Sequence, residues 1–447
     1  MTKTRQVVIA FLATISSYVI SQYTLKHYFA LLGILAIPFV IKRAFLLCIW
    51  FILFSYFRLH EAMPWLEPFK IPQLLALSCL AGLSWQVWFN FRGFQWHPLH
   101  TWLLIFALWI AICCVLASNR TESFEMLTGN FSKIVLMVFA ISLLPTHINQ
   151  LKRIPLLLIL CGLLIAFFTL YNKVHGIGLV EETRVTIGRE FGSMLGDPND
   201  LSLVLLFPLS FTLVYIFNPS HFIKCLAIVA TLMLLAGIMV TESRGGQLGV
   251  ISVIFMAILL HSRNIVIPMV ITAVGIIILF AAAGLENRFV SSASSGTIDE
   301  SAMGRIHAWI AAILMAVDNP MTGVGLGNFY NNYFFYTLHW DTKNHAVHSS
   351  WFEILSENGF VGLLLFAILV IKTFKLSYRL LHRLKHSNYQ PLAEGLWLGM
   401  ISFSVSGTFL TQGTTWPFYI LLSLLIATDR LSQDSTQLYQ HSQHAGT

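Results

Sequence analysis

Charged residues are scarce in this chain. Only 11% of its 447 residues are Asp, Glu, Lys or Arg, whereas a soluble domain carries about 25%. Hydrophobic residues make up 56% of the chain, and the mean hydropathy is +0.73. These values exclude a soluble domain of ordinary size and indicate an integral membrane protein. Any chemistry must therefore come from a few polar residues at the edges of apolar segments.

Cysteine is also rare, and its spacing gives no sign of a metal or redox site. The six cysteines lie inside or at the edges of predicted helices: Cys48, Cys79, Cys113, Cys114, Cys161 and Cys225. None has C-x-x-C spacing, so we interpret them as small apolar packing residues. The H-E-x-x-H motif of zinc hydrolases is absent as well, because Ala62-Met63-Pro64 follows His60-Glu61. The outer loops contain no D-x-D motif.

Long apolar runs fill most of the chain, and most of them are near the 20 residues that a helix needs to cross about 30 Å of hydrocarbon. We identify about fourteen runs: residues 6–22, 27–41, 44–57, 71–90, 98–117, 129–145, 153–172, 199–217, 221–240, 245–261, 264–284, 349–371, 391–411 and 415–428. Three of them are short, so the sequence predicts an all-α membrane protein with about 12–14 transmembrane helices. The first run is not followed by a small-residue cleavage site, and we interpret it as a helix rather than a signal peptide.

Basic residues gather in the loops on one side of these spans. With the N-terminus inside, the inner loops and termini hold 15 of the 27 Lys and Arg residues: Lys3, Arg5, Lys42, Arg43, Arg92, Lys152, Arg153, Lys224, Arg263, Lys372, Lys375, Arg379, Arg383, Lys385 and Arg430. They hold only three acidic residues, so the net charge is +12 inside and −5 outside. This is the positive-inside distribution of a membrane protein. The pI of 9.1 therefore reflects topology, and no nucleic-acid partner is expected.

Two long outer loops divide the chain into segments. We predict transmembrane helices in residues 1–172, 201–284 and 348–430, outer loops at 173–200 and 285–347, and an inner tail at 431–447. Within the second loop, residues 304–317 are apolar at helical spacing and are expected to lie on the outer membrane face, ending at Asp318-Asn319-Pro320. Residues 323–329 then form a tight glycine loop. No strand precedes its G-x-G-x-G pattern, so we reject a nucleotide-binding interpretation.

Arginines on the outer side are candidate ligands for phosphate. Arg184 and Arg189 lie in the first outer loop, and Arg244 lies at the break between two spans. Guanidinium groups bind phosphate oxygens in a bidentate manner, and two or three arginines match a diphosphate. The alternative for Arg184 and Arg189 is a solvated loop charge. The alternative for Arg244 is an interfacial arginine that snorkels or pairs with Glu242.

His348 stands where the second outer loop meets the next apolar span. A histidine titrates near neutral pH, which suits proton transfer. The alternative is a histidine near a helix start with no chemical role. His345 and His348 form a metal site only if acidic residues from elsewhere complete the coordination shell.

Four groups of residues occur in a fixed order on the outer side. They are Arg189, Gly192, Pro198 and Asn199; Ser243-Arg244-Gly245; Gly304, Arg305 and Trp309 ahead of the glycine loop; and His348, Glu357, Gly359 and Gly362. Over about residues 180–370, this set resembles the O-antigen ligase and O-antigen polymerase superfamily of bacterial membrane glycosyltransferases. Ser349 and Phe352 stand where the family usually has Asn and Leu. His348-Ser349, with residues 196–200, is most similar to the branch of exosortase-system O-glycosylation ligases.

The resemblance implies a glycosyltransferase of the GT-C type in the bacterial inner membrane, with its active site facing the periplasm. The implied donor is a preassembled glycan on undecaprenyl diphosphate. The implied acceptor is a hydroxyl of a glycan, of lipid A-core or of another molecule. Transfer would be inverting, and neither a metal nor a cofactor is expected, because the lipid diphosphate is already a good leaving group.

Roles for individual residues follow from the same resemblance. His348 is implied as the general base, and Arg244, Arg189 and Arg184 as diphosphate ligands. The candidate substrate-binding residues are Arg305, His345 and Asn199, and the alternative for Arg305 is that it caps its helix.

Three other functions remain to be weighed. A polymerase of the same superfamily shares the chemistry and differs only in its acceptor. A transporter of the lipid-linked glycan fits the helix count, but the two halves of the chain share no repeated motif and the polar residues lie on one side. A zinc hydrolase is not supported, because the H-E-x-x-H motif is absent. We therefore expect a ligase first and a polymerase second.

Overall fold

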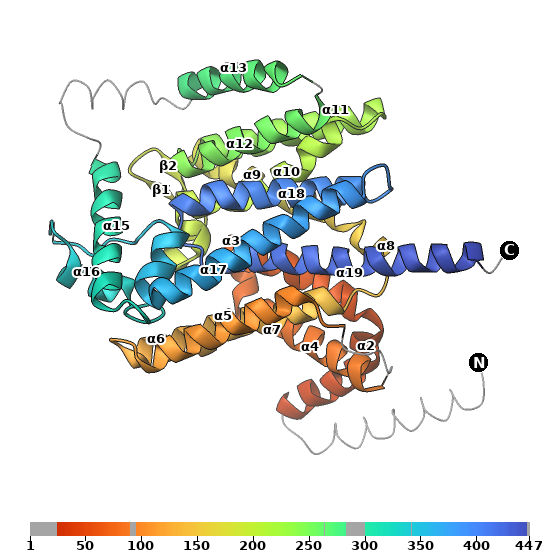
Figure 1. Ribbon diagram of the computed structural model, residues 1–447, viewed down its shortest axis with the longest axis horizontal. Helices are drawn as coiled ribbons and strands as arrows, with labels where there is room; N and C mark the ends of the chain where they lie inside the picture. The colour runs from red at the N-terminus through yellow and green to blue at the C-terminus, as the bar shows by residue number, and fades with distance from the viewer. Residues whose placement is uncertain (1–24, 90–94, 263, 283–299, 341, 445–447) are drawn as a thin grey trace.

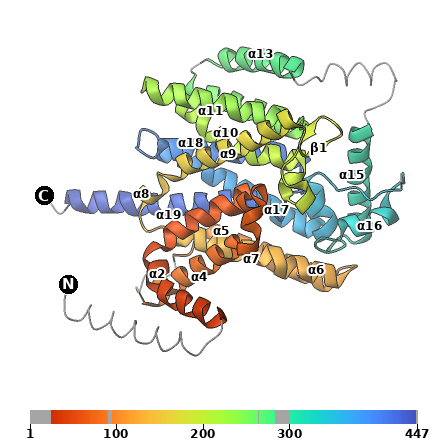
Figure 2. The same cartoon turned by 180° about the vertical axis from the view of Figure 1, so that it is seen from behind.

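The computed structural model describes residues 25–89, 95–262, 264–282, 300–340 and 342–444, and most of them are helical (Figures 1 and 2). The long helices are α2 (Leu25–Phe57), α4 (Ile71–Phe89), α5 (Pro98–Val115), α7 (Ser132–Leu143), α9 (Ile154–His175), α10 (Pro198–Ile216), α11 (His221–Met239), α12 (Arg244–His261), α13 (Val266–Ala282), α15 (Glu300–Asp318), α17 (Ser350–Arg383), α18 (Gln390–Ser406) and α19 (Trp416–His444). The short elements are α3 (Leu59–Ala62), η1 (Pro64–Phe69), α6 (Arg120–Met126), η2 (Leu127–Phe131), α8 (Ile148–Leu151), β1 (Leu179–Val180), β2 (Arg184–Val185), η3 (Arg189–Phe191), η4 (Met194–Gly196), α16 (Phe329–Tyr336) and η5 (Gly407–Phe409).

Seven of the described helical segments are long and apolar enough to cross a membrane: Pro98–Val115, Arg120–Leu143, Ile148–His175, Pro198–Ile216, His221–Met239, Arg244–His261 and Ser350–Arg383. The protein is therefore an all-α, multi-pass membrane protein, as the sequence predicts. The figure of seven counts only the described residues, whereas the prediction of 12–14 covers the whole chain. Helix α18 has 17 residues, and a straight spanning helix needs about 20.

The predicted spans at 27–41 and 44–57 correspond to the two helical segments of α2, which meet at a kink at Arg43 (φ −117°, ψ 17°). The backbone of Arg43 is not helical, so the helix is interrupted where Lys42 and Arg43 interrupt the hydropathy. The two segments are joined without an intervening loop. The predicted span at 6–22 lies outside the described residues.

Helix α10 lies at the centre of the fold. Of its most apolar 18-residue window, 83% is buried, a higher share than in any other of the seven candidate spans. It packs against α9, α11, α12 and α18, which explains why it is apolar on all sides. Figure 1 shows these helices beside a second group that includes α5, α7, α17 and α19. The long axes of most spans run in a common direction, so the molecule has two distinct ends.

Helix α15 confirms the helix predicted in the second outer loop. The prediction covered residues 304–317, and the helix spans Glu300–Asp318 and ends where Asp318-Asn319-Pro320 was expected to stop it. Figures 1 and 2 show that α15 runs across the ends of the long helices rather than along them. It packs against α17 and α16.

The glycine loop docks onto a break in α17. Gly359 has φ 68° and ψ −173°, which interrupts the helix and frees the carbonyls that precede it. The N–H of Val324 donates to Ser356 O (2.8 Å), and the N–H of Gly325 donates to Glu357 O (3.0 Å). The N–H of Phe360 donates back to Pro320 O (2.9 Å). The loop follows a helix and satisfies backbone groups of α17, which agrees with our rejection of a nucleotide site.

Candidate active site

Three helix N-termini meet at the end of the molecule that carries α15. Helices α10, α12 and α17 are capped by Asp197, Ser243 and Ser349, whose side chains accept hydrogen bonds from backbone N–H groups of the first turn. The N-terminus of a helix carries a partial positive charge and free N–H groups. A convergence of three such ends favours a bound anion.

Asn199 and Arg184 join two of these helix starts. Asn199 is buried (4% exposed), and its Oδ1 accepts hydrogen bonds from Ser243 Oγ (2.9 Å) and from Arg184 Nη2 (3.1 Å). Arg184 Nε donates to Thr241 O (3.2 Å), and Nη1 lies 3.6 Å from Glu181 Oε2. The Arg184 side chain is only 12% exposed. The interpretation of Arg184 as a solvated loop charge is therefore wrong.

A small β-hairpin positions Arg184. Strands β1 and β2 pair antiparallel, with Val180 opposite Arg184. The N–H of Val185 donates to Val240 O (3.3 Å), which fixes the hairpin to the end of α11. Sequence patterns did not predict these strands, since each has two residues.

His348 lies next to the same cluster. It is half-buried and has a left-handed backbone (φ 47°), and Ser349 rather than His348 caps α17. Burial lowers the pKa of His348, and the positive charges of Arg305 and Arg184 together with His345 lower it further, whereas the negative charge of Asp197 opposes them. Three of the predicted site residues, Arg184, Arg305 and His345, therefore lie near enough to His348 to lower its pKa. The lowered pKa favours the neutral imidazole at pH 7.

The loop at residues 410–415 holds the His348 segment in place. Thr411 Oγ1 accepts a hydrogen bond from the His348 N–H (3.1 Å), and the Gln412 N–H donates to Ser350 Oγ (3.1 Å). The Gln412 side chain donates to Asp200 Oδ1 (2.6 Å), which links α17 to the start of α10. The Gly413 N–H donates to Glu353 Oε2 (2.8 Å).

Sequence reasoning missed this loop and the role of Asp197. The polar run from Thr411 to Thr415, between two apolar stretches, could have indicated this loop. The sequence placed the run on the outer side of the membrane, but it did not indicate which helix ends the loop would contact.

Arg305 lies in the second turn of α15, whose first residue is Glu300, so the interpretation of Arg305 as a helix cap is wrong. One turn further along the same face, Trp309 Nε1 donates to Val347 O (3.0 Å), and its ring stacks on Phe352 (5.2 Å between centroids). These contacts attach α15 to the His348 segment. His345 packs edge-on against Tyr333.

Arg244 and Arg189 differ in their surroundings. Arg244 is the first residue of α12 and is half-buried, directly after the capping Ser243. Glu242, its suggested partner, accepts a hydrogen bond from Thr183 Oγ1 (3.1 Å) and lies 4.0 Å from Lys173 Nζ. Arg189 is exposed on the turn η3, and it is the one predicted arginine that remains open to solvent.

Among the described residues, no group of three or more His, Cys, Asp or Glu side chains is arranged to hold a metal ion.

The fold and the site together define a multi-pass membrane protein with a basic, histidine-containing site at one end of its helices. Residues 229–367 match a protein-family model described as O-antigen ligase. This match supports membership of the O-antigen ligase superfamily, and it supports a membrane glycosyltransferase of the ligase and polymerase type. The matched region runs from α11 through α12 and α15 into α17, and so includes Arg244, Arg305, His345 and His348. No curated protein matches the chain.

Proposed function

We propose that this protein transfers a preassembled glycan en bloc from undecaprenyl diphosphate to an acceptor hydroxyl, as an O-antigen ligase does. The reaction takes place at the periplasmic face of the bacterial inner membrane and needs no metal ion. The observation that carries the proposal is the convergence on His348 of Arg184, Arg305 and His345 beside three helix N-termini.

His348 acts as the general base. Its imidazole is neutral at pH 7 because burial and neighbouring positive charges lower its pKa. It accepts the proton of the acceptor hydroxyl while the hydroxyl oxygen forms a bond to the anomeric carbon. The bond from that carbon to the diphosphate oxygen breaks on the opposite face, so the configuration inverts. The Thr411 hydrogen bond and the Trp309 contact fix the segment that carries the base.

Arg244 and Arg184 stabilise the negative charge that develops on the leaving diphosphate. Arg184 is pre-positioned by Asn199 and Thr241, and Arg244 extends from the N-terminus of α12. Preorganised positive groups of this kind contribute about 3–4 kcal/mol each when they act like an oxyanion donor. Arg189 contributes from the solvent-exposed edge, where it meets the donor as it enters. Arg305, His345 and Asn199 shape the substrate site.

The lipid product and the acceptor test the proposal. Purified protein is incubated with an undecaprenyl-diphosphate glycan, a panel of glycan and lipid A-core acceptors, and a chelator. Release of undecaprenyl diphosphate together with a glycosylated acceptor is the expected result. A product in which glycan chains are joined to one another identifies a polymerase instead. Movement of the intact lipid across a vesicle bilayer without product contradicts a transferase.

A further inference from the structure

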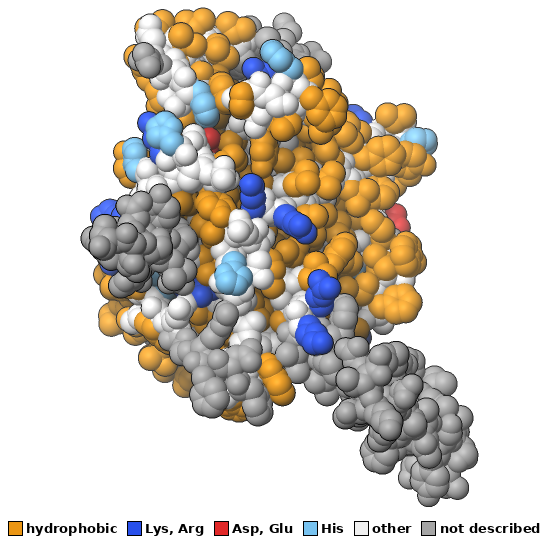
Figure 3. All heavy atoms as spheres, turned by 90° about the vertical axis from the view of Figure 1, so that its right-hand side faces the viewer, with side chains coloured by type: hydrophobic (Ala, Val, Ile, Leu, Met, Phe, Trp, Pro, Cys, Tyr) orange, Lys and Arg blue, Asp and Glu red, His pale blue; other side chains and the backbone are white. Residues whose placement is uncertain are grey.

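A second polar region lies at the opposite end of the long helices, remote from His348. Helix α17 begins beside the candidate active site, and its part after the break at Gly359 extends over about 36 Å toward this end. Figure 3 views this end directly and shows several Lys and Arg side chains gathered on it with few acidic ones. The region includes a cavity of about 1020 Å³ between the start of α5, the second half of α17 and α19.

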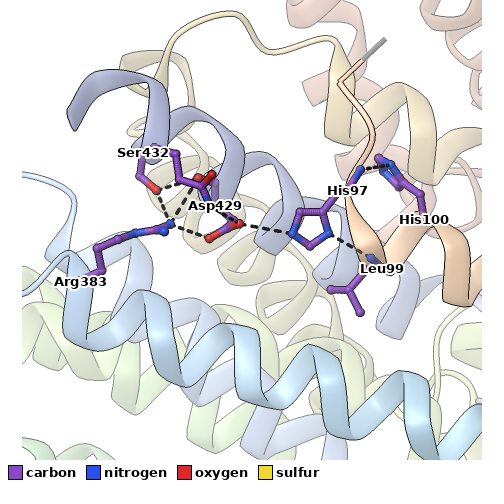
Figure 4. Close-up of polar contacts among 7 residues, drawn as sticks. His97, Leu99, His100, Arg383, Asp429 and Ser432 are labelled. Carbon is purple, nitrogen blue, oxygen red and sulfur yellow. Dashed lines mark hydrogen bonds and ion pairs between the residues drawn. The ribbon is translucent and has the colours of Figure 1, made fainter. Parts of the chain in front are cut away.

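Cations outnumber acids in the lining of this cavity. Lys372, Lys375, Arg379 and Arg430 line it, against one carboxylate, Asp429. Asp429 already interacts with Arg383 Nη2 (2.6 Å from Oδ1) and with His97 Nε2 (3.3 Å from Oδ2), as Figure 4 shows. Arg383 therefore offsets Asp429, and among the described lining residues the four cations leave a local excess of positive charge.

The cations are arranged as a site rather than scattered. Lys372, Lys375 and Arg379 follow i, i+3, i+7 spacing and so share one face of α17. The Lys372 ammonium lies 5.0 Å from the centre of the Trp102 ring, a cation–π distance that restrains it. The Arg430 guanidinium donates to Gln95 Oε1 and to the Pro145 and Leu143 carbonyls, and these hydrogen bonds hold it in place.

Most of the remaining lining is apolar or aromatic. Trp96, Pro98, Leu99, Phe374 and Tyr378 form this part of the wall, beside the polar residues Gln95, His97 and Gln433, and Tyr378 is half exposed. Aromatic side chains at the ends of spanning helices mark the depth of lipid headgroups. Helix α5 begins at Pro98, so the cavity opens where an apolar span ends. A phosphate would contact the cations while the glycerol and first acyl carbons contact this wall.

We propose that this cavity binds the headgroup of an anionic membrane phospholipid. Basic pockets between transmembrane helices are suited to such headgroups, and the volume exceeds what a free phosphate ion requires. The site is separate from the glycan-transfer site and does not depend on its function. Bound lipid bridges α5, α17 and α19.

Lipid retention measured by native mass spectrometry tests the proposal. The full-length protein in detergent is titrated with phosphatidylglycerol or phosphatidylcholine, and the bound lipids are counted. We expect one tightly held phosphatidylglycerol. The variant Lys372→Gln/Lys375→Gln/Arg379→Gln should bind it about a hundredfold more weakly, since each cation near a headgroup contributes about a factor of five. The single variant Arg379→Gln should lose about fivefold.

A matched control removes the same charge from the same membrane side. Lys42→Gln/Lys152→Gln/Lys224→Gln neutralises three lysines on other elements and should leave phosphatidylglycerol affinity within about twofold of the wild type, because these lysines do not line the cavity. An equal loss in the control would mean that diffuse surface charge binds the lipid, and would overturn the proposal. Equal affinity for phosphatidylcholine, or full displacement of the lipid by inorganic phosphate, would overturn it too, the latter in favour of a soluble anion.

Discussion

Replacing Gly359 with alanine should destabilise the protein strongly, because the break in α17 depends on this residue. Gly359 has φ 68° and ψ −173°, a conformation that is essentially restricted to glycine. An added Cβ would overlap the carbonyl oxygen of Met321 and lie 2.7 Å from that of Pro320. Both carbonyls belong to the segment that docks the glycine loop onto α17.

The magnitude follows from these two effects. An alanine held in this backbone region costs about 1–3 kcal/mol. Relieving the overlap by shifting packed backbone costs about a further 1–3 kcal/mol. The free energy of unfolding should therefore fall by about 2–6 kcal/mol. The docked loop also connects to α15, which carries Arg305, so glycan transfer should fall as well.

Thermal unfolding in detergent measures the effect. We expect Gly359→Ala to lower the unfolding midpoint by about 2–6 °C, because a chain of 447 residues has a large unfolding entropy. The control is Gly275→Ala, because a Cβ at Gly275 meets nothing within 4 Å and the residue lies inside helix α13, where alanine is favoured. A midpoint for Gly359→Ala equal to that of the wild type would refute the role of this break.

Three further predictions concern the site. The transfer rate should rise with pH through an acid limb below about 6.5, because burial and nearby positive charge lower the pKa of His348. Asp197→Asn still caps α10 but removes the opposing negative charge, so this limb should move to lower pH; an unchanged pH–rate profile would show that Asp197 does not act on His348. Arg244→Ala should lower kcat by about 100- to 1000-fold and leave the KM of the acceptor nearly unchanged, as steady-state kinetics would show; an unchanged kcat would contradict the role of Arg244 at the leaving diphosphate. Thr411→Val should remove the hydrogen bond to the His348 backbone and lower kcat about fivefold with little change in folding, and an unaltered kcat would contradict that role.

The sequence predicts the apolar spans well, because each run has to satisfy its backbone within a helix in the membrane. The sequence is less informative about how the backbone continues where charged residues interrupt an apolar run. Lys42 and Arg43 were expected to separate two spans, and α2 is broken at Arg43, but the sequence did not show that the two segments would meet without a loop. The length of α17 was also underestimated: the chain remains helical beyond residue 371, because basic residues at a helix C-terminus favour the helix dipole.

The sequence named candidate site residues but not the residues that they would contact. It singled out Arg184, Arg244 and His348, and the structure places Arg184 near enough to His348 to lower its pKa. It did not indicate that Asn199 would bridge Arg184 and Ser243, or that the 410–415 loop would hold His348. Such contacts join residues far apart in the chain and depend on how α10, α12, α17 and α18 pack. Hydropathy and spacing do not encode that packing.

Glycan transfer by His348 variants is the most direct test of the proposed function. His348→Ala removes the base, and His348→Asn removes it while tolerating the left-handed backbone at this position. The control is His175→Ala, an exposed histidine at the end of α9. With an undecaprenyl-diphosphate glycan and acceptor present, both His348 variants should fold normally and lose transfer by about a hundredfold or more, whereas His175→Ala should retain it. Wild-type rates of undecaprenyl diphosphate release in the folded His348 variants would contradict a catalytic role for this histidine.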